Sequence, residues 1–122
     1  MTKYQSALIV DDQKEQIDLV KEYLQLQEIE ATGVSNFYKF KETFLNEAPD
    51  LVILDISMPD HDGYDYISWI AEQNIATSMI FISGLGHEVL EIAKAMTEDS
   101  KIQVLESFQK PFTYENLESA FQ

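Results

Sequence analysis

The amino-acid sequence predicts an α/β fold in which helices cover both faces of a parallel β-sheet. Short runs rich in Val, Ile, Leu and Phe alternate with longer amphipathic stretches, and five such repeats follow one another along 122 residues. The apolar runs lack polar alternation, which is typical of strands buried on both faces of a sheet. A chain of this length fits one compact domain, so we expect a single domain over residues 1–122.

Five strands are expected from the apolar runs. The run LVILDI is the clearest, because four apolar residues precede its aspartate. A helical stretch after each run would carry the chain back to begin the next strand in the same direction. The predicted strands are Ser6–Val10, Ile29–Val34, Leu51–Ile56, Met79–Ser83 and Ile102–Phe108.

Five helices are expected, each with one apolar face that packs against the sheet. Residues three and four positions apart share a face of a helix, and apolar residues recur at this spacing in every stretch between strands. The third helix is predicted from about Gly63 to Asn74, and Thr113 is the expected N-cap of the last one. The residues that define the five faces are Ile17, Val20 and Leu24; Phe37, Phe40 and Phe44; Tyr64, Ile67, Ile70 and Ala71; Val89, Ile92, Ala93 and Met96; and Leu117, Ala120 and Phe121.

The composition is that of an acidic globular protein. Lys and Arg number 8 against 22 Asp and Glu, which gives a formal net charge of -14. This charge repels a phosphate backbone, so direct binding of nucleic acid is not expected. The absence of cysteine excludes disulfides and thiolate metal sites. No apolar stretch reaches the length of a signal peptide or a membrane span, so we expect a cytoplasmic protein without a membrane partner.

Charged and polar side chains follow four of the predicted strands. Asp11 and Asp12 come after the first, Asp55 lies at the end of the third, Ser83 ends the fourth, and Lys110 follows the fifth. In a parallel α/β sheet, the loops at the carboxyl ends of the strands converge on one crevice. These five side chains are therefore expected at one edge of the sheet.

Three carboxylates at one edge predict a cation site. Their mutual repulsion would raise their pKa values unless a positive charge neutralises them, and a divalent ion together with Lys110 could do so. A site with oxygen ligands only, and with positions left for water, is typical of Mg²⁺. A nearby phosphorus atom would then be easier for the Asp55 carboxylate to attack.

Four sequence segments together resemble a known family. IVDDQ, LVILDISMPDHDGYD, IFISG and FQKPF are similar to the signature segments of receiver domains of two-component response regulators, in the same order, and the resemblance covers nearly the whole chain. It implies a flavodoxin-like three-layer sandwich, with a five-stranded parallel sheet of order 2-1-3-4-5 and five helices. It also implies a domain that takes a phosphoryl group from a histidine kinase, or from a small acyl phosphate, and then switches its partner or oligomer interactions.

The resemblance assigns the metal site and the phosphoacceptor. Asp55 matches the phosphoacceptor of the family, and Asp11 and Asp12 match the acidic pair that holds the metal. The backbone carbonyl of Ser57 matches a further metal ligand, beside Asp55 itself. The implied cofactor is Mg²⁺.

The resemblance also assigns groups around the phosphoryl position. Ser83 matches the hydroxyl that hydrogen-bonds the phosphoryl group, and Lys110 matches the cation of the family. Pro111 stands where the family has a cis peptide bond, and Gly63 matches the turn glycine that opens the third helix.

One position departs from the family pattern. The family usually carries Tyr or Phe three residues before the lysine, and this chain has Ser107 there. Phe108 is adjacent, but the alternation of side chains along a strand directs it to the opposite face. The sequence therefore predicts that the response to phosphorylation is transmitted without the usual change in an aromatic rotamer at this position.

The resemblance implies protein partners. These are a sensor histidine kinase or a phosphotransfer protein upstream, and an effector domain or a second copy of the chain downstream. The domain is not expected to be an enzyme beyond its own phosphorylation and slow dephosphorylation. Two alternatives stay open: a degenerate receiver that binds partners without phosphorylation, and an aspartyl-phosphate phosphatase. The phosphatase is disfavoured because its acid would stand two residues after Asp55, where this chain has Ser57.

Overall fold

The computed structural model describes residues 4–58 and 62–121. Strands and helices alternate strictly along the chain, as the five sequence repeats predict. The elements are β1 (Ser6–Val10), α1 (Lys14–Leu26), β2 (Glu30–Val34), α2 (Phe37–Glu47), β3 (Leu51–Asp55), α3 (Gly63–Glu72), β4 (Thr77–Ser83), α4 (His87–Ala95), β5 (Ile102–Gln109) and α5 (Tyr114–Ala120).

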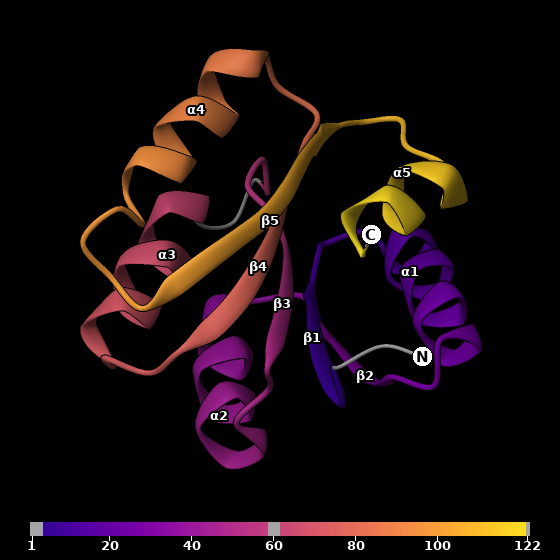
Figure 1. The fold of residues 1–122 in the computed structure, drawn as a ribbon, viewed down its shortest axis with the longest axis horizontal. Helices are drawn as coiled ribbons and strands as arrows, with labels where there is room; N and C mark the ends of the chain where they lie inside the picture. The colour runs from indigo at the N-terminus through magenta and orange to yellow at the C-terminus, as the bar shows by residue number, and fades with distance from the viewer. Residues whose placement is uncertain (1–3, 59–61, 122) are drawn as a thin grey trace.

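The five strands form one parallel sheet in the order β2-β1-β3-β4-β5 (Figure 1). All residues of β3 and β4 are buried, whereas the edge strands β2 and β5 include exposed and half-buried positions. Continuous burial of central strands requires layers on both faces, which explains why their sequences lack polar alternation. The sheet order confirms the flavodoxin-like arrangement.

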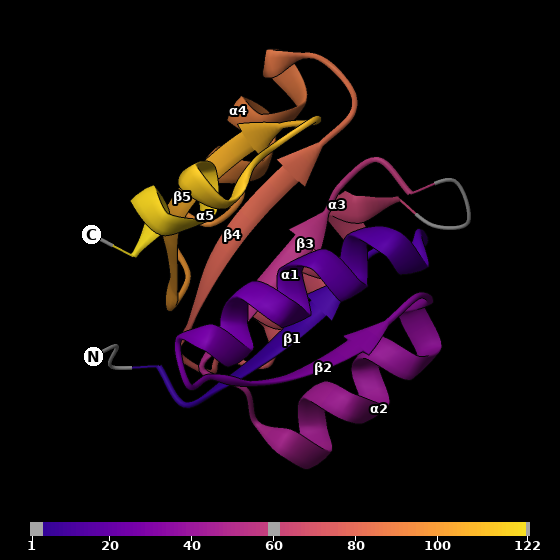
Figure 2. The ribbon, with the colours of Figure 1, turned by 90° about the vertical axis from the view of Figure 1, so that its right-hand side faces the viewer.

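The sheet separates two hydrophobic cores. Figures 1 and 2 show α1 and α5 on one face and α2, α3 and α4 on the other. Alternate residues of β1 serve the two sides: Leu8 and Val10 pack with α2 to α4, while Ala7 and Ile9 pack with α1 and α5. The result is the three-layer sandwich that the sequence predicts.

Element ends differ from the sequence prediction by a few residues. The helix expected to reach Asn74 ends at Glu72, because Asn74 has a φ of 56° in the left-handed region and cannot continue a right-handed helix. β4 begins at Thr77 instead of Met79 and buries its polar first residues, and the Thr77 hydroxyl donates to the Pro49 carbonyl oxygen at 3.2 Å. The predicted cap of α5 is confirmed, since the Thr113 side chain accepts a hydrogen bond from the Asn116 backbone N–H.

One core assignment is wrong. Ile92 is 52% exposed, although its spacing placed it on the apolar face of α4. The buried residues of this helix are Leu90 and Ala93, three positions apart, and Val89 and Met96 pack beside them. Ile92 lies two positions after Leu90, and a step of about 100° per residue turns it away from the sheet.

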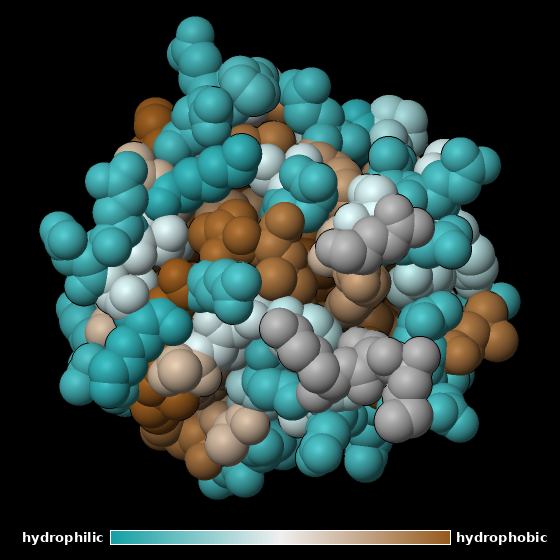
Figure 3. Space-filling model, viewed as in Figure 1, coloured by the Kyte–Doolittle hydropathy of each residue, from teal (hydrophilic) through white to brown (hydrophobic). Residues whose placement is uncertain are grey.

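The surface of the face seen in Figure 1 is mostly polar. Figure 3 shows hydrophilic side chains around its periphery and an apolar area near the middle, where Figure 1 places β5. This edge strand includes the half-buried Val104 and Leu105. Among the described residues, no helix is both long enough and apolar enough to cross a membrane.

Candidate functional site

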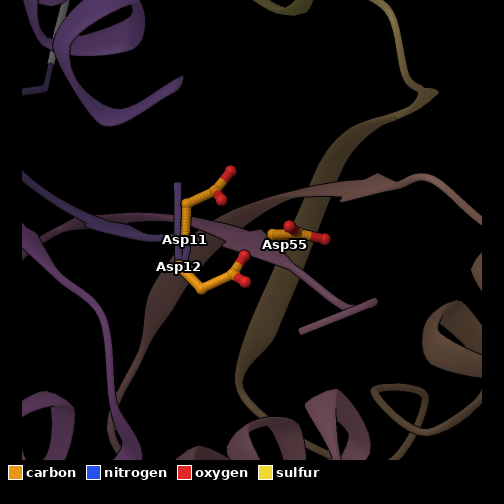
Figure 4. A group of neighbouring side chains, drawn as sticks. All are labelled: Asp11, Asp12 and Asp55. Carbon is orange, nitrogen blue, oxygen red and sulfur yellow. The ribbon is translucent and has the colours of Figure 1, made fainter. Parts of the chain in front are cut away.

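Three aspartates converge at the carboxyl edge of the sheet. Asp11 and Asp12 follow β1 and Asp55 ends β3, and one carboxylate oxygen from each lies within 4.8 Å of the others (Figure 4). Val10 of β1 pairs with Leu54 of β3, so the residues that follow leave the sheet side by side. Asp11 and Asp55 are 4% and 2% exposed, whereas Asp12 is exposed to solvent. The predicted acidic cluster is thus assembled.

Lys110 supplies positive charge to this cluster. Its Nζ lies 2.9 Å from Asp55 Oδ2 and 3.3 Å from Asp11 Oδ2, and its side chain is 18% exposed. The backbone N–H of Lys110 donates to the Ser83 carbonyl oxygen at 2.8 Å, which fixes the start of the side chain beside the end of β4. The peptide bond to Pro111 is cis, as the resemblance implies.

Burial and charge shift the pKa values of this group. Burial raises the pKa of Asp11 to about 6, and the Asp55 charge adds to this effect; the Gln13 backbone N–H and Lys110 oppose it. Burial alone would lower the pKa of Lys110, but the hydrogen bond and charge of Asp55, together with Asp11, outweigh it and raise the pKa. A buried carboxylate such as Asp11, whose ionised form burial makes unfavourable, fits a hard cation with oxygen ligands.

Replacing Asp11 by Asn is expected to stabilise the metal-free protein at neutral pH. The raised pKa means that the stability contributed by protonated Asp11 is fully present below about pH 4 and is lost as the pH rises through about 6. After a discount for solvent screening, ionisation of Asp11 between these pH values lowers the free energy of unfolding by about 1–2 kcal/mol. Urea unfolding in EDTA at pH 7.5 should give a higher free energy of unfolding for Asp11→Asn than for the wild type. The exposed Asp18→Asn variant is the control and should match the wild type. A less stable Asp11→Asn protein would contradict the assigned charge penalty.

Ser57 contacts Asp55 through two donors. Its backbone N–H and its hydroxyl both donate to Asp55 Oδ1, at 2.9 and 2.8 Å. The same hydroxyl accepts a hydrogen bond from the Gly84 N–H at 3.0 Å. The sequence singled out the carbonyl of Ser57 and missed its hydroxyl, and the carbonyl's role as a metal ligand stays a prediction.

Gly63 opens α3, as predicted, and its lack of a side chain is required. A Cβ at this position would lie 2.5 Å from the Ile56 carbonyl oxygen and 2.6 Å from the Ile56 Cα. Backbone atoms cannot yield that space, so only glycine allows the start of α3 to pack on the residue that follows Asp55.

Ser83 lies at the same edge, fully buried at the end of β4. Its hydroxyl accepts a hydrogen bond from the Leu85 backbone N–H at 2.9 Å, within its own loop. A contact between this hydroxyl and a phosphoryl group stays a prediction.

The departure at Ser107 has the geometry that strand alternation predicts. Ser107 pairs with Phe81, whose side chain belongs to the core under α2 to α4. Phe108 lies in the opposite core, where its ring stacks on Phe112 with a centroid distance of 6.3 Å. No aromatic side chain from this part of β5 therefore faces the α4 side.

Gln13 is a site residue that the sequence did not identify. Its side-chain Oε1 accepts a hydrogen bond from Lys110 Nζ at 3.3 Å, and its backbone N–H donates to Asp11 Oδ1 at 2.9 Å. The available signal was its place in the IVDDQ segment, directly after the acidic pair.

Comparison with known proteins gives the family of this chain. Residues 7–122 match the model of the response regulator receiver domain. The chain belongs to this family. It is a receiver domain of two-component response regulators, and its acidic cluster is compatible with Mg²⁺ and a phosphorylated aspartate.

Curated relatives of this receiver domain include regulators of different length. The sensory transduction protein BceR of Halalkalibacterium halodurans is 30% identical over 115 residues, which cover 94% of this chain and 47% of BceR. The chemotaxis protein CheY of Halobacterium salinarum is 31% identical over 104 residues, which cover 85% of this chain and 86% of CheY. The receiver domain thus spans about half the length of BceR and most of the length of CheY.

Solved structures share the fold. The signal receiver domain of a Luxo repressor protein from Vibrio parahaemolyticus matches with a TM-score of 0.82 at 21% identity, over 96% of this chain and 86% of that one. The response regulator TrrA of Thermotoga maritima, solved in complex with Mg²⁺-BeF, matches with a TM-score of 0.76 at 25% identity, over 93% of both chains.

Proposed function

We propose that residues 1–122 form one receiver domain that accepts a phosphoryl group on Asp55 with the help of Mg²⁺. The observation that carries this proposal is the environment of the Asp55 carboxylate. It lies buried at the carboxyl edge of the sheet, 2.9 Å from the Lys110 ammonium and beside two further carboxylates. A carboxylate that lies between a lysine ammonium and other carboxylates able to bind a metal ion can act as the nucleophile of phosphoryl transfer.

The proposed reaction moves one phosphoryl group without net oxidation or reduction. An oxygen of the Asp55 carboxylate attacks the phosphorus of a phosphohistidine or an acyl phosphate and forms an acyl phosphate on the domain. The bond from phosphorus to the donor nitrogen or oxygen breaks, and its electron pair leaves with that atom. A histidine donor then takes up a proton, whereas a carboxylate donor leaves as the anion.

Lys110 and Ser83 complete the proposed site. The Lys110 ammonium lies within 3.3 Å of two aspartates and is placed to hold the transferred group by charge. In the proposal, the Ser83 hydroxyl gives up the Leu85 N–H and turns to a phosphoryl oxygen. Neither residue exchanges a covalent bond in the reaction.

The residues present fit a Mg²⁺ ion. Asp11, Asp12 and Asp55 offer carboxylate oxygens within 4.8 Å of one another, and we assign the Ser57 carbonyl as a further ligand. When bound, Mg²⁺ supplies charge that neutralises phosphoryl oxygens in the transition state. The Mg²⁺-BeF complex of TrrA, 25% identical to this chain, supports the assignment.

The proposed partners are proteins. A sensor histidine kinase or a phosphotransfer protein would donate the phosphoryl group, and an effector domain or a second copy would respond to it. Relatives such as the transcriptional regulatory protein YxdJ of Bacillus subtilis, of which this chain spans 44%, support a role in regulation. With a net charge of -14, this domain itself is not proposed to touch nucleic acid, and we place it in the cytoplasm.

Acetyl phosphate tests the proposal directly. After incubation with Mg²⁺, intact mass spectrometry should show the added mass of one phosphoryl group. When EDTA is present from the start of the incubation, the protein should keep its unmodified mass. A protein that never gains phosphate would instead be a degenerate receiver. Sustained release of inorganic phosphate over many turnovers, with no phosphorylated protein detected, would indicate a phosphatase.

A further inference from the structure

The Ser57 hydroxyl connects the proposed phosphoacceptor to the loop that follows β4. It donates to Asp55 Oδ1 at 2.8 Å and accepts from the Gly84 N–H at 3.0 Å. Both distances are those of good hydrogen bonds, and the hydroxyl uses one donor and one acceptor function at the same time. Asp55 and Gly84 are thus joined through one oxygen atom.

Each of the two contacts occupies a group that an acyl phosphate on Asp55 would use or change. Asp55 Oδ1 already accepts from the Ser57 backbone, and the second donor withdraws further charge from a carboxylate that must act as a nucleophile. Gly84 directly follows Ser83 and belongs to the exposed loop before α4. Its N–H is a backbone donor next to the acceptor carboxylate, and the Ser57 hydroxyl holds it.

We propose that the Ser57 hydroxyl is a latch of the unphosphorylated domain, a regulatory contact that restrains Asp55 and the β4–α4 loop together. The inference rests on the proposed phosphorylation of Asp55. An oxygen that becomes part of an acyl phosphate loses most of the charge that attracts the Ser57 O–H. The new phosphoryl oxygens are charged acceptors and compete with Ser57 for the Gly84 N–H. The latch opens when Gly84 exchanges the hydroxyl for the phosphoryl group.

The latch makes the unphosphorylated arrangement more stable than it would be with an alanine. Ser57→Ala removes the bridge and leaves the Ser57 backbone N–H on Asp55 Oδ1. One hydrogen bond to a charged group is worth enough to change a binding constant about tenfold. Ser57→Thr keeps a hydroxyl at the same position and should preserve the bridge. Ser119→Ala is a matched control, because it deletes a hydroxyl on the exposed face of α5.

The test titrates the full chain with beryllofluoride at saturating Mg²⁺ and follows the Gly84 amide resonance by NMR. Ser57→Ala should bind beryllofluoride about tenfold more tightly than the wild type at saturating Mg²⁺. Before any addition, its Gly84 resonance should already lie closer to the position of the bound wild type. Ser57→Thr and Ser119→Ala should match the wild type in both measurements.

Two outcomes would overturn the latch, and they differ from failure of the proposed function. Equal or weaker beryllofluoride binding by Ser57→Ala, in a wild-type background that binds it, refutes the latch alone. An unshifted Gly84 resonance in free Ser57→Ala does the same, because it shows that the hydroxyl does not restrain the loop. A wild-type protein that binds no beryllofluoride in the presence of Mg²⁺ refutes phosphoryl acceptance at Asp55 itself.

Discussion

Asp55→Asn protein is expected to keep its unmodified mass after incubation with acetyl phosphate and Mg²⁺, while the wild type gains one phosphoryl group. The amide is a poor nucleophile at phosphorus, and no other carboxylate of the cluster has the same contact of 2.9 Å with Lys110. The expected effect is complete loss of the modification. The control is Asp18→Asn, which replaces an exposed carboxylate of α1 that is paired with Lys14. This variant should gain one phosphoryl group, as the wild type does.

The Asp55→Asn protein should also fold. Its amide oxygen can still accept from the two Ser57 donors, and the loss of charge relieves repulsion with Asp11 while it weakens the attraction to Lys110. These effects oppose one another, so the free energy of unfolding should change by no more than about 1 kcal/mol. A phosphorylated Asp55→Asn protein would show that another residue accepts the group.

Lys110→Ala is expected to separate metal binding from the response to phosphorylation. Removal of the ammonium leaves the acidic cluster more negative, so affinity for Mg²⁺ should stay the same or rise. The phosphoryl group loses its charged partner, and a charge-assisted hydrogen bond of about 1.5–3 kcal/mol corresponds to at least a tenfold loss in beryllofluoride affinity. The measurements are titrations with Mg²⁺ alone and with beryllofluoride at saturating Mg²⁺.

The control for Lys110→Ala is Lys14→Ala. Lys14 is also paired with an aspartate, at 3.1 Å, but its side chain is 85% exposed at the start of α1. Exposed pairs contribute little, so both titrations should match the wild type. Equal losses of Mg²⁺ and beryllofluoride affinity in Lys110→Ala would mean that the lysine organises the metal site instead of the phosphoryl position.

The sequence was sufficient to predict the position of the acidic cluster, because position at a strand end depends only on strand order and direction. Asp11 and Asp55 meet for this reason, and Lys110 reaches them from the end of β5. The face of the sheet to which Phe108 points was also predictable, although a register irregularity interrupts β5 upstream of it. Alternation resumes beyond the irregularity, so the side assigned to Ser107 is unaffected.

Side-chain contacts in loops were not predictable in the same way. The hydroxyls of Ser57 and Ser83 each rotate about one bond, and each accepts a hydrogen bond from a backbone N–H whose position depends on the loop path. Gln13 joins the site only because the turn after β1 folds it toward Lys110. The error at Ile92 has another origin, since a short apolar pattern fits two adjacent helix faces and only packing selects between them.

The close approach at Gly63 divides the carboxyl edge of the sheet into a stiff half and a compliant half. The backbone at Gly63 packs directly on the backbone of Ile56, so the first turn of α3 cannot shift without breaking this contact. We therefore expect α3 and the end of β3 to move together. At Gly86, an added Cβ would meet no described atom within 4 Å. A displacement that starts at Asp55 should therefore move the start of α4 more easily than the start of α3. Amide hydrogen exchange should accordingly be faster in the first turn of α4 than in the first turn of α3.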